Sequence, residues 1–212
     1  DELNLDEASP FQRLSGLNRI LLDFYQTNIK LVDESLFLGL HNLEELKLKV
    51  YIVECLSRTV FALLRQLKRL ELACLEFRSL EMDALGRLDQ LEELTLSSIK
   101  IPQIESHSFH GLLRLRKLTL SRTAALCALD DQLLSGLANL EELHLTFNRI
   151  ASIAPNAFAS LRKLTVLSLQ ENQMETLAAD TFVGLDRLTC LNLCKNRIVN
   201  FDQDPLARTS NG

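Results

Sequence analysis

Leucine recurs along this chain with a period of about 24 residues, and this period restricts the possible folds more than any other feature of the sequence. Counted from the first leucine of each LxxLxL segment, the repeats begin at Leu17, Leu43, Leu67, Leu91, Leu115, Leu140, Leu164 and Leu188. The intervals between these starts are 26, 24, 24, 24, 25, 24 and 24 residues. Such a period indicates a solenoid, in which each repeat is one structural unit that stacks on the next.

The LxxLxL segment of each repeat predicts a β-strand. Residues two apart on a strand share a face, so Leu143 and Leu145 point inward together. A single repeat cannot bury its apolar side alone, whereas stacked repeats can, and their strands then pair in a parallel sheet. The next inward positions, such as Ile150 and Ile153, are unevenly spaced. We therefore expect the chain to turn after each strand and return along an outer face.

One place of the repeat is nearly always aromatic, which supports this alignment. It holds Phe11, Phe37, Phe61, Phe109, Phe158 and Phe182, with Leu85 and Leu134 at the two other positions. Three repeats also end alike, as FLGL (37–40), FHGL (109–112) and FVGL (182–185). We expect these phenylalanines to form a spine through the core.

The ninth place, counted from the opening leucine, is asparagine only in the last three repeats, at Asn148, Asn172 and Asn196. The chain leaves the sheet there, and a buried amide can both donate to and accept from the backbone of neighbouring turns. Earlier repeats carry Tyr51, Leu75, Ile99 and Thr123 at this place. We therefore expect an asparagine ladder in the C-terminal half and looser or re-routed turns in the N-terminal half.

The repeats cover nearly the whole sequence and leave no linker. We expect a single domain over residues 1–212, with about seven full repeats from 17 to 187 and partial repeats at both ends. The net charge of −5 argues against a nucleic-acid partner, because phosphate binding needs a concentrated excess of Lys and Arg. The sequence lacks a run of about 18 apolar residues, so we expect no membrane insertion.

The segments LEELHLTFNRIASIAPNAFASL (140–161) and LTVLSLQENQMETLAADTFVGL (164–185) resemble the typical 24-residue leucine-rich repeat. This repeat occurs mostly in extracellular proteins, including Toll-like receptor ectodomains, variable lymphocyte receptors and Slit-type guidance proteins. The resemblance implies an α/β-class horseshoe with a parallel concave sheet and a mostly irregular convex side, and it implies recognition as the activity. Two features depart from it, since the sequence has neither the cysteine-rich end caps nor an Asn-x-Ser/Thr glycosylation motif.

The cysteines and histidines offer little support for a metal or catalytic site. Cys190 and Cys194 would lie roughly 13 Å apart along one strand, too far for a mutual disulfide or a shared zinc. Unpaired, surface-facing thiols are the expectation. His107 and His110 form an H-x-x-H without a helical pattern or a third ligand. A smooth solenoid face gives no pocket in which a nucleophile and a base converge, so we expect no metal, cofactor or enzymatic activity.

Charged pairs follow the opening leucine, and their sign alternates over five consecutive strands: Glu44-Glu45, Lys68-Arg69, Glu92-Glu93, Arg116-Lys117 and Glu141-Glu142. Neighbouring parallel strands lie about 4.8 Å apart, so each pair faces opposite charges on both sides. We expect a ladder that fixes the register of the sheet. The alternative is a charged ligand site, which a self-neutralising ladder disfavours.

Beyond this ladder the strands carry small and polar residues, which predicts the binding surface. The candidate ligand-binding residues are Arg122, His144, Thr146, Ser168, Gln170 and Asn192. We expect them to project outward from the sheet, while Phe147 packs under the turn. A flat polar surface suits a macromolecule better than a small molecule, which needs concavity and apolar walls. The rival site is a loop projected by the extra residues near Tyr25 to Asn28.

These observations favour a non-catalytic recognition module that binds a protein or other macromolecule through its concave sheet. The resemblance places it outside the cell, as a secreted protein or receptor ectodomain like the Toll-like receptors. The alternative is a cytosolic leucine-rich repeat scaffold or regulatory protein, favoured by unpaired thiols. Leu191, Leu193 and Ile198 have no following repeat to cover them, which predicts association of two chains through exposed ends.

Overall fold

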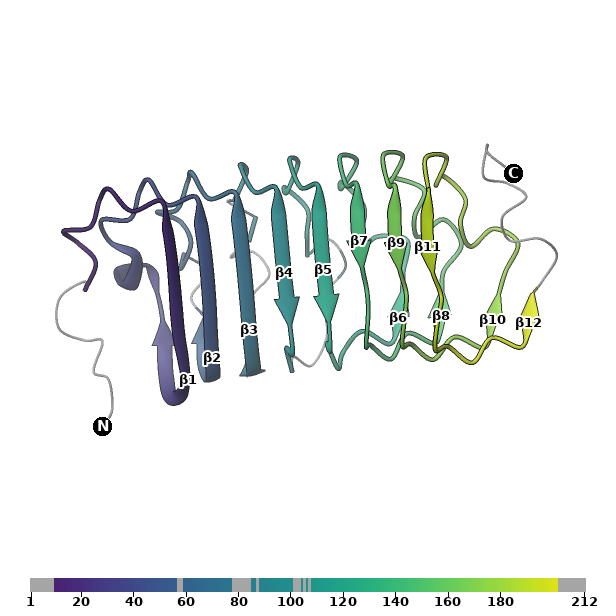
Figure 1. Cartoon of the computed structure of the whole chain (residues 1–212), viewed down its shortest axis with the longest axis horizontal. Coiled ribbons are helices and arrows are strands. Elements are labelled where there is room, and N and C mark those ends of the chain that lie inside the picture. Colours follow the sequence, from purple (N-terminus) through teal and green to yellow (C-terminus); the bar gives the residue numbers. More distant parts are fainter. Residues whose placement is uncertain are drawn as a thin grey trace.

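A computed structural model describes residues 10–56, 59–77, 85–86, 88–100, 104, 106 and 108–201, without the side chains of 25–32, 52–56, 74–77 and 201. The chain forms an elongated solenoid with one parallel sheet along its length (Figure 1). In order across the sheet, the strands are β1 (Arg19–Val32), β2 (Glu45–Leu56), β3 (Arg69–Phe77), β4 (Glu93–Ser97), β5 (Lys117–Ser121), β7 (Glu142–His144), β9 (Val166–Ser168) and β11 (Cys190–Asn192). The predicted leucine-rich-repeat-type solenoid is confirmed.

The register of this sheet pairs each repeat place with the same place in the next repeat. Leu118 pairs with Leu143, for example, and Leu143 pairs with Leu167. Side chains at one place therefore form a row across the strands, and a surface can be read as a set of parallel rows.

The convex side contains only short regular elements. A 3₁₀ turn, η1 (Glu34–Phe37), follows β1. Two-residue strands pair in two small parallel sheets, β6 (Ala128–Leu129) with β8 (Ser152–Ile153), and β10 (Thr176–Leu177) with β12 (Asn200–Phe201). Within the described ranges, the helical part of the α/β class is limited to η1.

The N-terminal strands are the long ones, at 14, 12 and 9 residues for β1, β2 and β3. Each of β2 and β3 continues through the ninth place, where Tyr51 and Leu75 stand. The N-terminal half is irregular as predicted, but its strands extend where looser turns were expected. The extra residues near Tyr25 to Asn28, expected to project a loop as the rival site, lie within β1, whose register with β2 shifts between Phe24 and Asn28.

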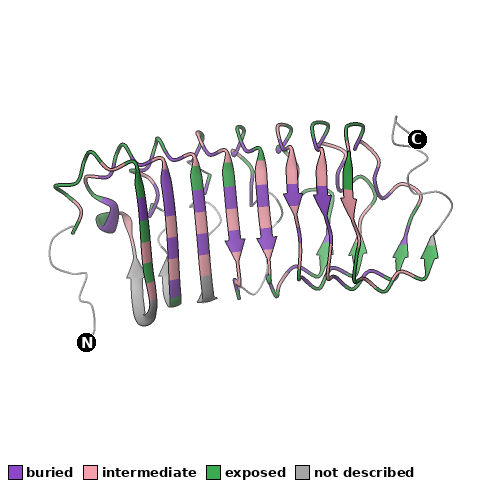
Figure 2. Ribbon diagram, in the orientation of Figure 1, coloured by how far each residue is buried: buried purple, intermediate pink, exposed green. Residues whose placement is uncertain are grey.

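The leucines of the strands and the aromatic place build one continuous core. Phe37, Phe61, Phe109, Phe158 and Phe182 are at most 1% exposed, as is Leu85. The rings of Phe37 and Phe61 lie 6.1 Å apart, and those of Phe158 and Phe182 lie 6.3 Å apart in a stacked arrangement. The predicted spine is confirmed, and Figure 2 shows the buried places alternating along the strands.

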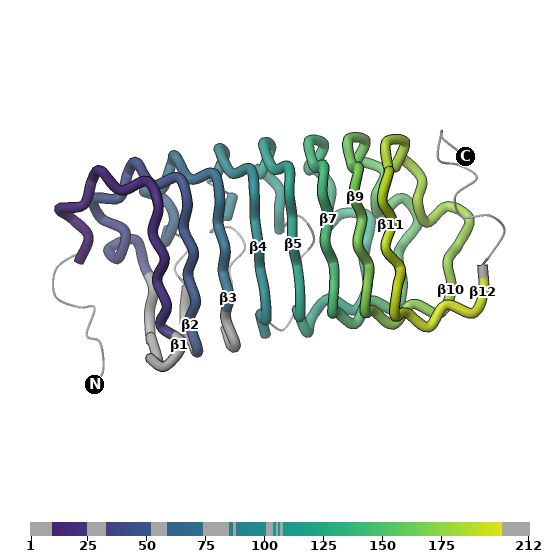
Figure 3. The backbone as a smooth tube through the Cα atoms, in the orientation of Figure 1, coloured from purple at the N-terminus to yellow at the C-terminus, as the bar shows by residue number. Residues whose placement is uncertain are grey.

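The asparagine ladder is also confirmed. The Asn172 amide nitrogen donates to the backbone carbonyl of Leu145 at 2.7 Å, and its oxygen accepts from the backbone N–H of Ile150 at 3.1 Å. Asn196 makes the equivalent bonds to Leu169 and Met174, one repeat later. Each asparagine therefore satisfies two backbone groups of the preceding repeat. Figure 3 shows the backbone leaving the sheet after β7, β9 and β11.

The shared repeat ending FxGL has a steric origin. Gly39 and Gly184 adopt φ angles of 91°, which side-chain-bearing residues rarely populate. A Cβ atom on Gly184 would meet the Ala159 Cα atom at 2.8 Å. Glycine therefore permits both the turn and the close approach of successive repeats on the convex side.

Candidate binding surface

The predicted charge ladder forms, but it is divided into two groups. On the N-terminal side, Glu45 lies 3.2 Å from Arg19 and 3.1 Å from Arg69, and Lys68 lies 3.0 Å from Glu44. On the C-terminal side, the Arg116 guanidinium makes a two-point contact with Glu141, at 2.8 and 3.1 Å.

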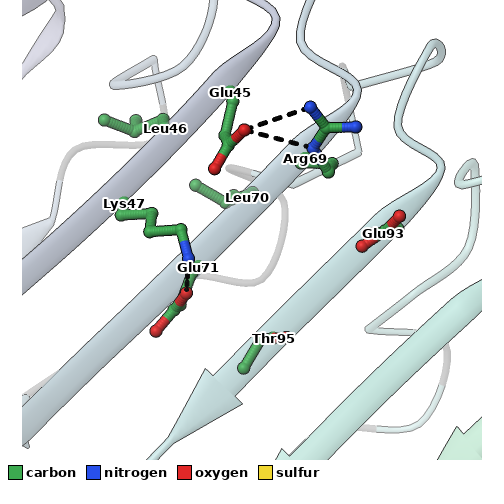
Figure 4. Close-up of a pocket in the computed structure, with 8 residues that line it drawn as sticks. All are labelled: Glu45, Leu46, Lys47, Arg69, Leu70, Glu71, Glu93 and Thr95. Carbon is green, nitrogen blue, oxygen red and sulfur yellow. Dashed lines mark hydrogen bonds and ion pairs between the residues drawn. The ribbon is translucent and has the colours of Figure 1, made fainter. Parts of the chain in front are cut away.

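Glu92 and Glu93 stand between these two groups. Within the described part of the chain, neither carboxylate has an ion-pair partner within 4.0 Å, since the flanking cations turn to their outer neighbours. Figure 4 shows the Arg69 guanidinium directed to Glu45 while Glu93 lies apart from it. A second row adds one more pair, Lys47 with Glu71 at 2.9 Å.

Two hollows lie along this ladder, and both are small. The hollow in Figure 4, between β2, β3 and β4, has a volume of about 70 Å³. The second, about 280 Å³, is lined by Glu92, Arg114, Arg116, Asn139, Glu141 and Lys163. Pockets that enclose drug-sized ligands usually measure about 300 Å³ or more. Neither hollow supports a small-molecule site.

The structure brings most of the predicted binding residues onto one face of β7, β9 and β11. His144, Ser168 and Asn192 form one row, paired across the three strands. The Asn192 amide donates to the Gln170 side-chain oxygen at 2.9 Å, which joins this row to the next. His144, Thr146, Gln170 and Asn192 are half-buried and Arg122 is exposed.

Ser168 is less accessible than a binding residue should be. It is only 7% exposed, and its register partners on both sides are the longer residues His144 and Asn192. Ser168 lies on the predicted face but is covered there, so a partner would contact His144 and Gln170 around it.

His144 is also tied to the ladder. Its Nε2 atom lies 3.3 Å from the Oε2 atom of Glu142, and the Nζ atom of Lys117 lies 2.7 Å from that same oxygen. The hydrogen bond from Lys117, followed by that from His144, lowers the pKa of Glu142 below its ordinary value of 4.5. Glu142, at the end of the ladder, and His144, at the start of the polar surface, therefore interact electrostatically.

Phe147 was expected under the turn, and this prediction is wrong. The residue is 40% exposed, and the Arg122 guanidinium carbon lies 4.5 Å from the centre of its ring. Both occupy the eighth place of their repeats, where the backbone is left-handed. The φ angle is between 53° and 58° at every such place from the fourth complete repeat onward: Ser98, Arg122, Phe147, Glu171 and Lys195. This shared backbone conformation turns the eighth side chain outward.

The eighth-place row continues with an ion pair. Lys195 lies 2.6 Å from Glu171, and this hydrogen bond lowers the pKa of Glu171 and raises that of Lys195. This row could not be predicted from the sequence, because none of its five residues is Gly, Asn or Asp, the types that commonly mark left-handed backbone.

Cys127, Cys190 and Cys194 are free and exposed, which confirms the expected unpaired surface thiols at Cys190 and Cys194. Strand β11 ends at Asn192, so Cys194 lies beyond the strand on which it was expected. His107, Cys55 and Cys74 carry no described side chain. Among the described residues, no cluster of three potential metal ligands occurs. No helix within them has the length and hydropathy needed to cross a bilayer.

The chain matches the family model described as "Leucine rich repeat" over residues 65–124 and 128–204. No curated protein matches it. Among solved structures, the chain is similar to TLR13 in a TLR13–ssRNA13 complex, with 26% identity and a TM-score of 0.82 over 91% of this chain.

Two bacterial proteins show the same fold. The internalin inlF of Listeria monocytogenes is 24% identical with a TM-score of 0.70 over 95% of this chain, and a leucine-rich repeat protein of Leptospira interrogans is 20% identical with a TM-score of 0.59 over 93%. This chain spans 27% of the TLR13 chain and about half of the other two, 54% and 55%. The repeats, their register and the family match agree: the chain belongs to the leucine-rich repeat family.

Proposed function

We propose that this protein is a non-catalytic recognition module that binds a protein partner through the concave face of β5, β7, β9 and β11. The observation that carries the proposal is the polar surface of His144, Thr146, Gln170 and Asn192. His144 and Asn192 lie on the paired strands β7 and β11, and Thr146 and Gln170 lie two residues beyond the ends of β7 and β9. Rigid elements hold contacts at low entropic cost. Leucine-rich repeat domains are generally binding modules, which supports the proposal.

The proposed setting is extracellular, as part of a Toll-like-receptor-like protein of immune or other signalling. The likeness to TLR13 over 91% of this chain supports it. We propose a protein rather than the RNA of that complex, since this chain has a net charge of −5 and RNA binding is strengthened by concentrated positive charge.

The test is partner capture by paired variants. The chain is immobilised and exposed to the surface and secreted proteins of its source organism. Proteins that bind are then fixed to it by chemical crosslinking. His144→Arg with Gln170→Arg should abolish capture of a specific protein without changing the circular dichroism spectrum. The control, Gln132→Arg, places the same bulky cation on the exposed convex side and should leave capture intact. Equal capture by all three proteins would refute the concave site.

The free thiols of Cys127, Cys190 and Cys194 favour a second candidate, a cytosolic leucine-rich repeat scaffold. Thiol titration of denatured, unreduced protein from its native source separates the two. Five reactive thiols indicate the reducing cytosol, whereas one or three indicate disulfides and an oxidising compartment.

A further inference from the structure

The carboxyl ends of the last strands form a positively charged edge, which we call the turn edge. It consists of the eighth and tenth places of the last five repeats, at the lower side of the sheet in Figure 1. Its charged residues are Lys100, Arg122, Arg149, Glu171, Lys195 and Arg197. The turn edge thus carries five positive side chains and one negative side chain, although the net charge of the whole chain is −5.

At the middle of the turn edge, Arg122 is held over the exposed ring of Phe147. The cation–π contact fixes the guanidinium without using its N–H donors. Among the described residues, the Arg122 side chain has no hydrogen-bond or ion-pair partner, although its charge helps to lower the pKa of Glu171. Five donors in a fixed planar fork are therefore available to a ligand.

The backbone beneath this pair is fixed in place. Arg122 donates its backbone N–H to the carbonyl of Thr146, and Phe147 donates to that of Gln170, at 3.4 and 3.0 Å. Both residues are left-handed at neighbouring repeats, which places their side chains in one row. A pre-ordered cation and ring lose little conformational entropy on binding.

We propose that the turn edge binds an acidic segment of a partner protein, with a carboxylate on Arg122 and an adjacent apolar side chain on Phe147. This inference rests on the proposed function and names the partner chemistry. A carboxylate matches the guanidinium fork in two-point geometry, and the surrounding cations attract an acidic segment. A nucleic acid would also meet Arg122, but the net charge of −5 opposes a long polyanion.

The probe is a phage-displayed library of random dodecapeptides, selected on the folded chain. Selected peptides should carry Asp or Glu within a few residues of an aromatic or large aliphatic side chain. Their affinity should fall at least tenfold for Arg122→Ala and for Phe147→Ala, and it should weaken in high salt. Arg162→Ala and Leu113→Ala remove an exposed arginine and an exposed leucine elsewhere and should have no effect.

A charge exchange provides the decisive comparison. Arg122→Glu should abolish binding of a selected peptide, and a Glu→Lys change in that peptide should restore it. A library without Arg122-dependent binders would overturn the inference, as would stronger Arg122-dependent binding of a twelve-nucleotide single-stranded RNA. Peptides that depend on His144 and Gln170 instead would overturn it and leave the proposed function standing. Circular dichroism of each variant separates lost binding from lost folding.

Discussion

The side-chain oxygen of Asn148 accepts a hydrogen bond from the backbone N–H of Thr123, 2.8 Å away in the preceding repeat. Its amide nitrogen donates to the Leu120 carbonyl of the same repeat at 2.9 Å. Thr123 occupies the ninth place itself, yet its own hydroxyl is buried without a partner among the described residues. The asparagine ladder therefore ends at Thr123, and the two residues mark the boundary between the regular and irregular halves.

Replacing Asn172 by alanine should destabilise the protein by about 2–4 kcal/mol, because buried backbone donors and acceptors lose their partner. The amide of Asn172 serves the carbonyls of Leu145 and Leu169 as well as the N–H of Ile150. Urea unfolding measures the change. The control, Gln173→Ala, alters an exposed neighbour and should shift the midpoint little.

Thr123→Val should stabilise the protein by about 1 kcal/mol, since a methyl group replaces a buried hydroxyl that has no partner. Thr123→Ser keeps the hydroxyl and loses a methyl group, so it should be less stable than the wild type. Thermal unfolding of the three proteins gives the order. A valine variant that melts below the wild type would show that the hydroxyl is solvated.

Reversing Arg116 and Lys117 to glutamate should lower the unfolding midpoint modestly, because Glu141 and Glu142 would then face like charges. High salt should reduce the loss, since these side chains are 59% and 41% exposed and exposed charges are screened. Reversing Arg162, an exposed arginine outside the ladder, serves as the control. A loss that is the same in low and high salt would contradict a ladder role.

Glu142 should make stability depend on pH in a defined direction. Its pKa is lowered in the folded protein by Lys117 and His144, so its ionised form contributes stability above the ordinary value of 4.5. That contribution is lost as pH falls through the lowered folded pKa. The midpoint difference between wild type and Glu142→Gln should be largest near neutral pH and shrink in acid. Glu175→Gln, at an exposed carboxylate outside the ladder, serves as the control.

The 212-residue chain by itself should associate through its C-terminal end. Leu191 and Leu193 are only partly buried, whereas their counterparts Leu167 and Leu169 are fully buried one repeat earlier. Covering such apolar surface favours dimers or larger assemblies. Sedimentation velocity should show concentration-dependent association, and Leu191→Lys should weaken it. A strictly monomeric chain at high micromolar concentration would refute this expectation.

The sequence predicted the rows of the sheet better than the directions of single side chains. The 24-residue interval fixes which places lie side by side, so the ladder pairs and the asparagine ladder followed from it. The interval does not decide which of two neighbours a long side chain contacts. The sequence therefore did not predict that the charge ladder is divided into two groups at Glu92 and Glu93. Ser168 and Phe147 were assigned by residue type. The exposure of Ser168 depends on its longer register partners, and that of Phe147 depends on a left-handed backbone.

The left-handed eighth place separates the direction of a side chain from its chemistry. Serine, arginine, phenylalanine, glutamate and lysine all occupy it here with nearly the same φ angle. Each accepts a conformational cost of roughly 1–2 kcal/mol, which the stacked repeats around it offset. The backbone thus sets where the side chain points, whatever its chemistry. Point mutations at this one place can therefore change the charge and shape of the turn edge while the path of the backbone stays the same.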